Sequence, residues 1–142
     1  MSDFLFVYGT LLAVAQHPMG DLLRAKGRFV GRGSIQARLY IIDDPDAPGR
    51  NFYPGAVPSA NPHERVFGEV HEVLDRDVFE AFDRFEACAP GDTEPYEFLR
   101  RPVRVTLEVG QELWARSYLY TWDVATAEYV PRGRYTEVSP DV

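Results

Sequence analysis

One carboxylate lies on the apolar face of a predicted amphipathic helix, where charged side chains are uncommon. Residues 75–87 predict this helix, and the apolar side chains that share its face are Leu74, Val78, Phe79, Phe82 and Phe85. Glu86 falls on the same face, four residues after Phe82 and seven after Phe79. Because burial raises the pKa of a carboxyl, Glu86 could both accept and donate a proton near neutral pH. Two other interpretations are a side chain that swings into water at the helix end and an ion pair with Arg100.

A glycine turn near the start of the chain is the second candidate for chemistry. The run Tyr8-Gly9-Thr10-Leu11-Leu12 follows a short apolar segment and precedes a predicted helix. Such a turn directs several backbone N–H groups at one spot, which would suit a substrate carboxylate or carbonyl oxygen. The run lacks the longer glycine-rich spacing and the lysine of a phosphate-binding loop. An ordinary corner between strand and helix would have the same pattern.

The cysteine and the histidines give weaker indications of chemistry. Cys88 and His71 could form a nucleophile and base, although a lone cysteine is more often a small buried apolar residue. His17, His63 and His71 do not have the spacing of metal ligands, so we expect no metal. With one cysteine, the chain cannot form an intrachain disulfide, which is compatible with a reducing compartment.

Length and composition favour one domain spanning residues 1–142. The chain has 142 residues, 45% of them apolar, which is enough for a single core. Its formal charge of -7 argues against nucleic acid as a partner, because such binding depends on clustered cations. No apolar stretch reaches the roughly 18–20 residues that span a bilayer, and the first residues do not resemble a signal peptide. We therefore expect a cytoplasmic protein that binds no membrane.

The remaining pattern predicts an α+β fold, built on a mixed sheet or a small barrel. Short strands are expected over 4–8, 66–74, 103–109 and 113–122, with a hairpin connection at 110–112. A first helix is expected over 17–25. Residues 29–42 predict two strands or one strand with a bulge, and 53–58, with a proline at each end, predict an edge strand or a turn.

Five short motifs, in order between residue 4 and about residue 122, resemble the gamma-glutamylcyclotransferase-like family, which includes AIG2-like and gamma-glutamylamine cyclotransferase-like proteins. They are Tyr8-Gly9-Thr10-Leu11, Leu39-Tyr40, Tyr53-Pro54-Gly55-Ala56, Phe67-Gly68-Glu69-Val70 and Phe82-Asp83-Arg84-Phe85-Glu86. The resemblance implies a small barrel-like α+β fold and a turn, from Tyr8 to Leu11, that holds a γ-glutamyl group. It also implies that Glu86 is the catalytic acid and base, with no cofactor.

The implied reaction is the closure of a γ-glutamyl amide to 5-oxoproline with release of an amine or amino acid. It is an intramolecular acyl transfer that is also classed as a lyase reaction. One position departs from the family pattern, because Phe98 stands where the family has a tyrosine. Tyr96, two residues earlier, and Tyr118 or Tyr120 on a late strand are therefore candidates to contact the substrate. The alternative is a member of the same fold that binds a small metabolite or a protein without catalysis.

Overall fold

The computed structural model describes residues 3–8 and 18–135, which form seven strands and two helices. The helices are α1 (Pro18–Lys26) and α2 (Asp77–Phe85). The strands are β1 (Asp3–Val7), β2 (Gly27–Asp43), β3 (Phe52–Pro58), β4 (Arg65–Val73), β5 (Phe98–Leu107), β6 (Glu112–Tyr120) and β7 (Glu128–Val130). No helix among these residues is long and apolar enough to cross a membrane. The prediction of an α+β fold is confirmed.

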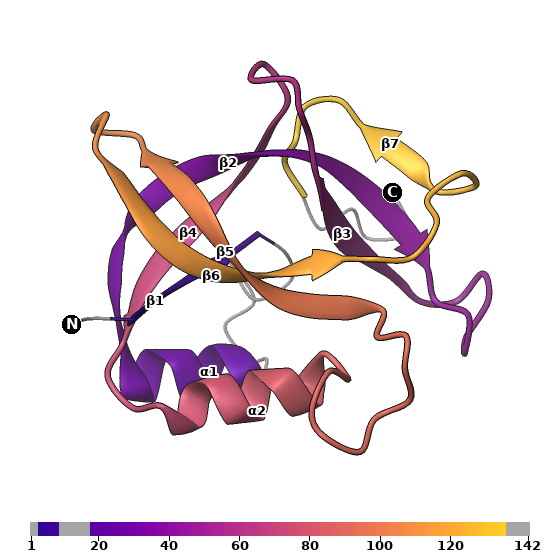
Figure 1. The fold of residues 1–142 in the computed structure, drawn as a ribbon, viewed down its shortest axis with the longest axis horizontal. Helices are drawn as coiled ribbons and strands as arrows, with labels where there is room; N and C mark the ends of the chain where they lie inside the picture. The colour runs from indigo at the N-terminus through magenta and orange to yellow at the C-terminus, as the bar shows by residue number, and fades with distance from the viewer. Residues whose placement is uncertain (1–2, 9–17, 136–142) are drawn as a thin grey trace.

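Five of the strands close into a barrel, which Figure 1 shows with both helices on one side of it. The order around the barrel is β2-β4-β1-β6-β5, and β5 pairs again with β2. Only the pairing of β1 with β6 is parallel among those in the described residues. β3 and β7 extend the sheet from the far half of β2. The barrel-like fold that the resemblance implied is confirmed.

Strand β2 closes the barrel because it pairs with β4 and β5 at the same residues. Gly33 lies opposite both Gly68 of β4 and Leu107 of β5. A Cβ atom on Gly33 would lie 2.6 Å from the carbonyl oxygen of Thr106, so only glycine allows this approach. The register shifts between Phe29 and Gly31. Of the two predictions for this segment, one strand with a bulge is therefore the right one.

The two helices cover an apolar cluster at the barrel wall. Leu23 of α1 and Val78 and Phe82 of α2 are buried against Leu5 and Val7 of β1. The helices lie side by side in Figure 1 and contact each other. Since α2 is held on the barrel by its apolar face, residues at its C-terminal end have a defined place relative to the end of β1.

Helix α2 is shorter than predicted, and its apolar face is narrower. Val78, Phe79 and Phe82 are buried as predicted, but Leu74 is 65% exposed and Phe85 is 48% exposed. Leu74 precedes the first helical residue, and Phe85 is the last one.

Asp75 also lies outside α2, and the N-cap position is taken by Arg76, which makes no side-chain capping bond. The carboxylate of Asp75 accepts a hydrogen bond from the N–H of Asp77 at 3.0 Å. Asp77 is the first residue of α2, and a carboxylate in the first turn suits the helix dipole.

The largest differences from the predicted strands are in β5 and β7. β5 begins at Phe98 rather than at Val103 and includes Pro102, and the three-residue strand β7 was not predicted. β3 is the edge strand that its two prolines predicted, because it lies at one end of the strand order and pairs only with β2.

Candidate functional site

Glu86 directly follows α2 and caps its C-terminal end. Its N–H donates to the carbonyl oxygen of Phe82 at 2.8 Å. The residue as a whole is partly buried, and its carboxyl lies deep enough for burial to raise its pKa. Burial is the larger cause and the charge of Glu97 the smaller one, and together they raise the pKa from 4.5 to about 7. Glu86 therefore ends the helix, as one interpretation had it, but its carboxyl is not in bulk water.

The charge of Glu86 reaches Tyr8, the last described residue before the glycine turn. Burial raises the pKa of Tyr8, a hydrogen bond from Ala56 lowers it, and the carboxylate of Glu86 raises it further. The Tyr8 hydroxyl donates to the carbonyl oxygen of Tyr118 at 2.5 Å and accepts from the N–H of Ala56 at 3.1 Å. Tyr8 thus joins the end of β1 to β6 and β3, and the structure brings it into the electrostatic neighbourhood of Glu86.

The other three residues predicted for the turn, Gly9, Thr10 and Leu11, lie outside the described residues. Their role in holding the γ-glutamyl group stays a prediction.

Asp83 fixes the last turn of α2 to the barrel. The hydroxyl of Tyr118 donates to its Oδ1 at 2.6 Å, and Arg100 forms an ion pair with its Oδ2 at 3.6 Å. The carbonyl oxygen of Asp83 accepts from the N–H of Cys88 at 2.9 Å. Arg100 therefore pairs with Asp83, not with Glu86, which removes the ion pair that sequence reasoning had left open for Glu86.

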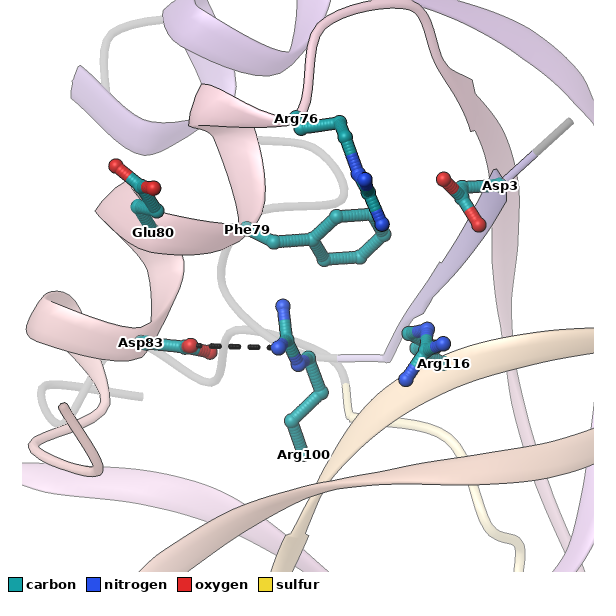
Figure 2. Close-up of a pocket in the computed structure, with 7 residues that line it drawn as sticks. All are labelled: Asp3, Arg76, Phe79, Glu80, Asp83, Arg100 and Arg116. Atoms are coloured by element: carbon teal, nitrogen blue, oxygen red, sulfur yellow. Dashed lines mark ion pairs between the residues drawn. The ribbon is translucent and has the colours of Figure 1, made fainter.

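Figure 2 shows the ion pair of Arg100 with Asp83 on the wall of a pocket of about 300 Å³ between α2 and the barrel. Seven residues line it: Asp3, Arg76, Phe79, Glu80, Asp83, Arg100 and Arg116. The guanidinium of Arg100 lies over the ring of Phe79, 4.9 Å from its centroid, while the carboxylate of Glu80 points away from the other side chains. Glu86 is not part of this lining, so the pocket is distinct from the surroundings of the candidate acid and base.

A second carboxylate near Glu86 was missed by sequence reasoning. Glu97 directly precedes β5, is partly buried, and accepts a hydrogen bond from the hydroxyl of Tyr53. Burial is the main cause that raises its pKa, the bond from Tyr53 lowers it, and the charges of Asp44 and Asp46 raise it. The loop from Ala89 has no periodic pattern, so the only signal in the sequence was the position of Glu97 beside Phe98.

The predicted tyrosines lie in different surroundings. The Tyr118 hydroxyl is bonded to Asp83, and burial, the largest cause, raises its pKa. Tyr96 is partly buried, and its carbonyl oxygen accepts from the hydroxyl of Thr121. Tyr120 packs edge-on against Phe98 with their centroids 5.3 Å apart. Contact of Tyr96 or Tyr118 with a substrate stays a prediction.

Cys88 and His71 have other partners and do not form a nucleophile and base. The Nε2 atom of His71 lies 3.1 Å from a carboxylate oxygen of Glu69, and Cys88 Sγ lies 4.0 Å from Oδ1 of Asp83. Burial raises the pKa of the Cys88 thiol, which disfavours its nucleophilic form. Within residues 3–8 and 18–135, no group of three His, Cys, Asp or Glu side chains could hold a metal ion.

Comparison with solved structures places the fold among known proteins. An AIG2-like protein from Mus musculus superposes with a TM-score of 0.70 at 22% identity, over 99% of this chain and 92% of that one. A gamma-glutamyl cyclotransferase superposes with a TM-score of 0.62 at 18% identity, over 91% and 70%. An uncharacterized protein from Pyrococcus horikoshii gives 0.57 at 22%, over 94% and 89%. At these identities the likeness concerns the fold.

The sequence itself gives the assignment. No curated protein matches the chain. The family described as gamma-glutamyl cyclotransferase, AIG2-like, matches residues 5–137, nearly the whole chain and every motif noted above. The chain therefore belongs to the AIG2-like gamma-glutamyl cyclotransferase family.

Proposed function

We propose that the protein cyclises a γ-glutamyl amide to 5-oxoproline and releases an amine or amino acid, with Glu86 as general base and then general acid. One observation carries the proposal: a carboxyl with a pKa of about 7 lies at the end of α2 and acts electrostatically on Tyr8 beside the glycine turn. Membership of the family supports the substrate class.

The raised pKa matches the proton that has to be moved. An ordinary α-amino group has a pKa of about 8, so a glutamate at 4.5 would accept its proton at a cost of about 5 kcal/mol. At a pKa of about 7, the same transfer costs about 1.4 kcal/mol. The raised pKa of Glu86, which is caused mainly by burial, therefore removes most of the free-energy cost of this proton transfer.

In the proposed reaction, the carboxylate of Glu86 takes a proton from the substrate α-ammonium. The freed amine nitrogen attacks the γ-carbonyl carbon of the same molecule, which forms the ring C–N bond. Glu86 then gives the proton to the departing nitrogen as the original amide bond breaks. The attacking nitrogen still carries one proton more than the lactam, so the regenerated carboxylate of Glu86 takes this second proton and passes it to the released amine, which leaves as an ammonium ion. Atoms and charges then balance, because the α-ammonium of the substrate is replaced by the ammonium of the released product.

Positioning is assigned to the residues around Glu86. The turn from Tyr8 through Gly9 and Thr10 to Leu11 would hold the γ-glutamyl group with backbone N–H groups, which could also stabilise the developing oxyanion. Tyr96 and Tyr118 are proposed as further substrate contacts in place of the family tyrosine that Phe98 replaces.

A product assay separates this function from binding without catalysis. The wild-type protein is incubated with a panel of γ-glutamyl amino acids and γ-glutamyl amines, and 5-oxoproline is measured by mass spectrometry. We expect stoichiometric 5-oxoproline and free amine from at least one substrate class. If calorimetry detects binding but no member of the panel yields 5-oxoproline, the protein is a non-catalytic member of its family.

A further inference from the structure

Glu97 is held rigidly at the start of β5. Its carbonyl oxygen accepts from the N–H of Thr121 at 2.8 Å and from the Thr121 hydroxyl at 3.3 Å. One oxygen of its carboxylate accepts from the Tyr53 hydroxyl, a contact between segments 44 residues apart. The side chain therefore has a defined direction, with its second carboxylate oxygen left for another donor.

No cation in the described part of the chain balances Glu97 or Glu86. None of the ion pairs there includes either carboxylate. The charges that act on Glu97 are those of Asp44 and Asp46, and the charge that acts on Glu86 is that of Glu97. Because partly buried carboxylates are costly without a positive partner, this end of the barrel favours a ligand that brings one.

A row of packed aromatic rings begins at Tyr53, the hydrogen-bond donor to Glu97, and its two middle rings, Phe98 and Tyr120, are buried. Tyr53 and Phe98 have centroids 5.9 Å apart, Phe98 and Tyr120 5.3 Å, and Tyr120 and Trp122 6.5 Å. Trp122 is 40% exposed, and its indole N–H donates to the carbonyl oxygen of Pro95 at 3.1 Å, which fixes the outer ring. Aromatic faces beside a carboxylate are the usual surroundings of a bound ammonium group.

We propose that Glu97, oriented by the hydroxyl of Tyr53, whose ring packs against Phe98, binds an ammonium group of the substrate next to Glu86. This inference rests on the proposed function, because it assigns a recognition residue to the same site. The ammonium is either the α-ammonium of the γ-glutamyl group or a second cationic group on the amine that is released. The two sources share one chemistry and are separated by the test.

The test measures binding in a background without turnover. Calorimetry compares Glu86→Gln with the double variant Glu86→Gln/Glu97→Gln, using γ-glutamyl-1,4-diaminobutane and γ-glutamylpentylamine, an isostere that keeps the α-ammonium but has a methyl group in place of the terminal ammonium. Loss of a charge-assisted contact should weaken binding about tenfold or more. A loss with the diamine compound alone assigns the cation on the released amine, and an equal loss with both assigns the α-ammonium. Unchanged affinity for both compounds would overturn the proposal.

Two further variants keep the interpretation specific. Glu108→Gln in the same background removes an equal charge from an exposed residue beyond the other end of β5 and should leave both affinities unchanged. Tyr53→Phe keeps the carboxylate but removes its hydrogen-bond donor, and it should give a smaller loss with the same substrate preference. Turnover is measured separately in the wild-type protein. If the wild-type protein forms 5-oxoproline but Glu97→Gln does not weaken substrate binding, the role of Glu97 is rejected and the proposed function is not.

Discussion

Glu86 and Glu97 illustrate, at the scale of single residues, how a protein prepares a carboxyl for proton transfer near neutral pH. Burial supplies most of the change in the pKa of Glu86, and the nearby negative charge of Glu97 adds to it. A water-exposed glutamate at the end of the same helix would stay ionised and could not donate a proton near pH 7. The candidate chemistry thus depends on where the barrel wall places one side chain.

The pH dependence of turnover should report this carboxyl. Glu86 must be unprotonated to act as the base, so we expect kcat/KM to rise with pH through a midpoint near 7. Glu97→Gln removes a negative charge that raises the pKa of Glu86, so its midpoint should move to lower pH. Initial rates from pH 4 to 9 measure both. A midpoint near 4.5 in the wild-type protein would show that Glu86 is not the titrating base.

The free energy of unfolding should fall as pH rises, opposite to the expected rise in kcat/KM. Because the pKa of Glu86 is raised in the folded state, the stability that its protonated form provides is present below the unfolded pKa and is lost as pH rises through about 7. Glu86→Gln should therefore gain about 2 kcal/mol in free energy of unfolding, relative to the wild-type protein, between pH 5 and pH 8. Urea unfolding at the two pH values measures it. A pH-independent difference would mean that the carboxyl is not buried.

The sequence was sufficient to find Glu86 and insufficient to find Glu97. Glu86 shares a face with Phe79 and Phe82, a relation within one helix that spacing alone predicts. Glu97 is oriented by Tyr53, a residue 44 positions earlier in the chain, and only the tertiary fold brings the two together. A residue whose partners are all distant leaves no local pattern.

At the scale of elements, the last turn of α2 is the part that fixes the direction of Glu86. Asp83, three residues earlier, bonds to Tyr118 of β6 and pairs with Arg100 of β5. The hydrogen bond from the N–H of Glu86 to the carbonyl oxygen of Phe82 then fixes the backbone of Glu86 at the end of the helix. Two strands of the barrel are thus coupled to the carboxyl through one side chain.

Tyr118→Phe tests this coupling. Removing the hydroxyl takes one hydrogen bond from a partly buried carboxylate, so the free energy of unfolding should fall by about 1–3 kcal/mol. Tyr129→Phe, whose hydroxyl makes a longer 3.3 Å contact with Glu64, should change stability by less than about 0.5 kcal/mol. Urea unfolding compares the two. Equal stability of Tyr118→Phe and the wild-type protein, with a raised KM, would instead place the Tyr118 hydroxyl on the substrate.

Element types were easier to predict than element ends. The core of α2 followed from three buried positions, whereas Leu74 and Phe85 were wrongly placed on its buried face because periodicity does not show where a helix leaves its support. β5 starts at Phe98, ahead of the predicted Val103. It pairs with β6 along its length although Pro102 has no N–H to donate, which makes proline unfavourable inside a strand. Tertiary pairing therefore decided the ends.

At the scale of the whole molecule, the barrel closes at the seam between β2 and β5. Arg65 of β4 reinforces this seam, because its guanidinium donates to the carbonyl oxygen of Ser34 at 3.0 Å and to the hydroxyl of Thr106 at 3.2 Å. The sequence predicted a mixed sheet or a small barrel. It could not decide between them, because closure depends on Gly33 meeting strands from two distant parts of the chain.

Gly33→Ala should open this seam. The added Cβ would meet the carbonyl oxygen of Thr106 at 2.6 Å and the Cα of Leu107 at 3.1 Å, so we expect a loss of about 1–3 kcal/mol in free energy of unfolding. Gly31→Ala, on the same strand, would meet only a Leu107 methyl at 3.8 Å and should stay within about 0.5 kcal/mol of the wild-type value. Equal effects of the two substitutions in urea unfolding would contradict closure at Gly33.

Single-turnover formation of 5-oxoproline in Glu86→Gln tests whether Glu86 moves the protons. The control is Glu80→Gln on the same helix, an exposed residue whose carboxylate points away from the other side chains drawn in Figure 2. We expect Glu86→Gln to bind the γ-glutamyl substrate as the wild-type protein does but to form 5-oxoproline at least about a hundredfold more slowly, and we expect Glu80→Gln to be unchanged. Turnover by Glu86→Gln at the wild-type rate would contradict this expectation.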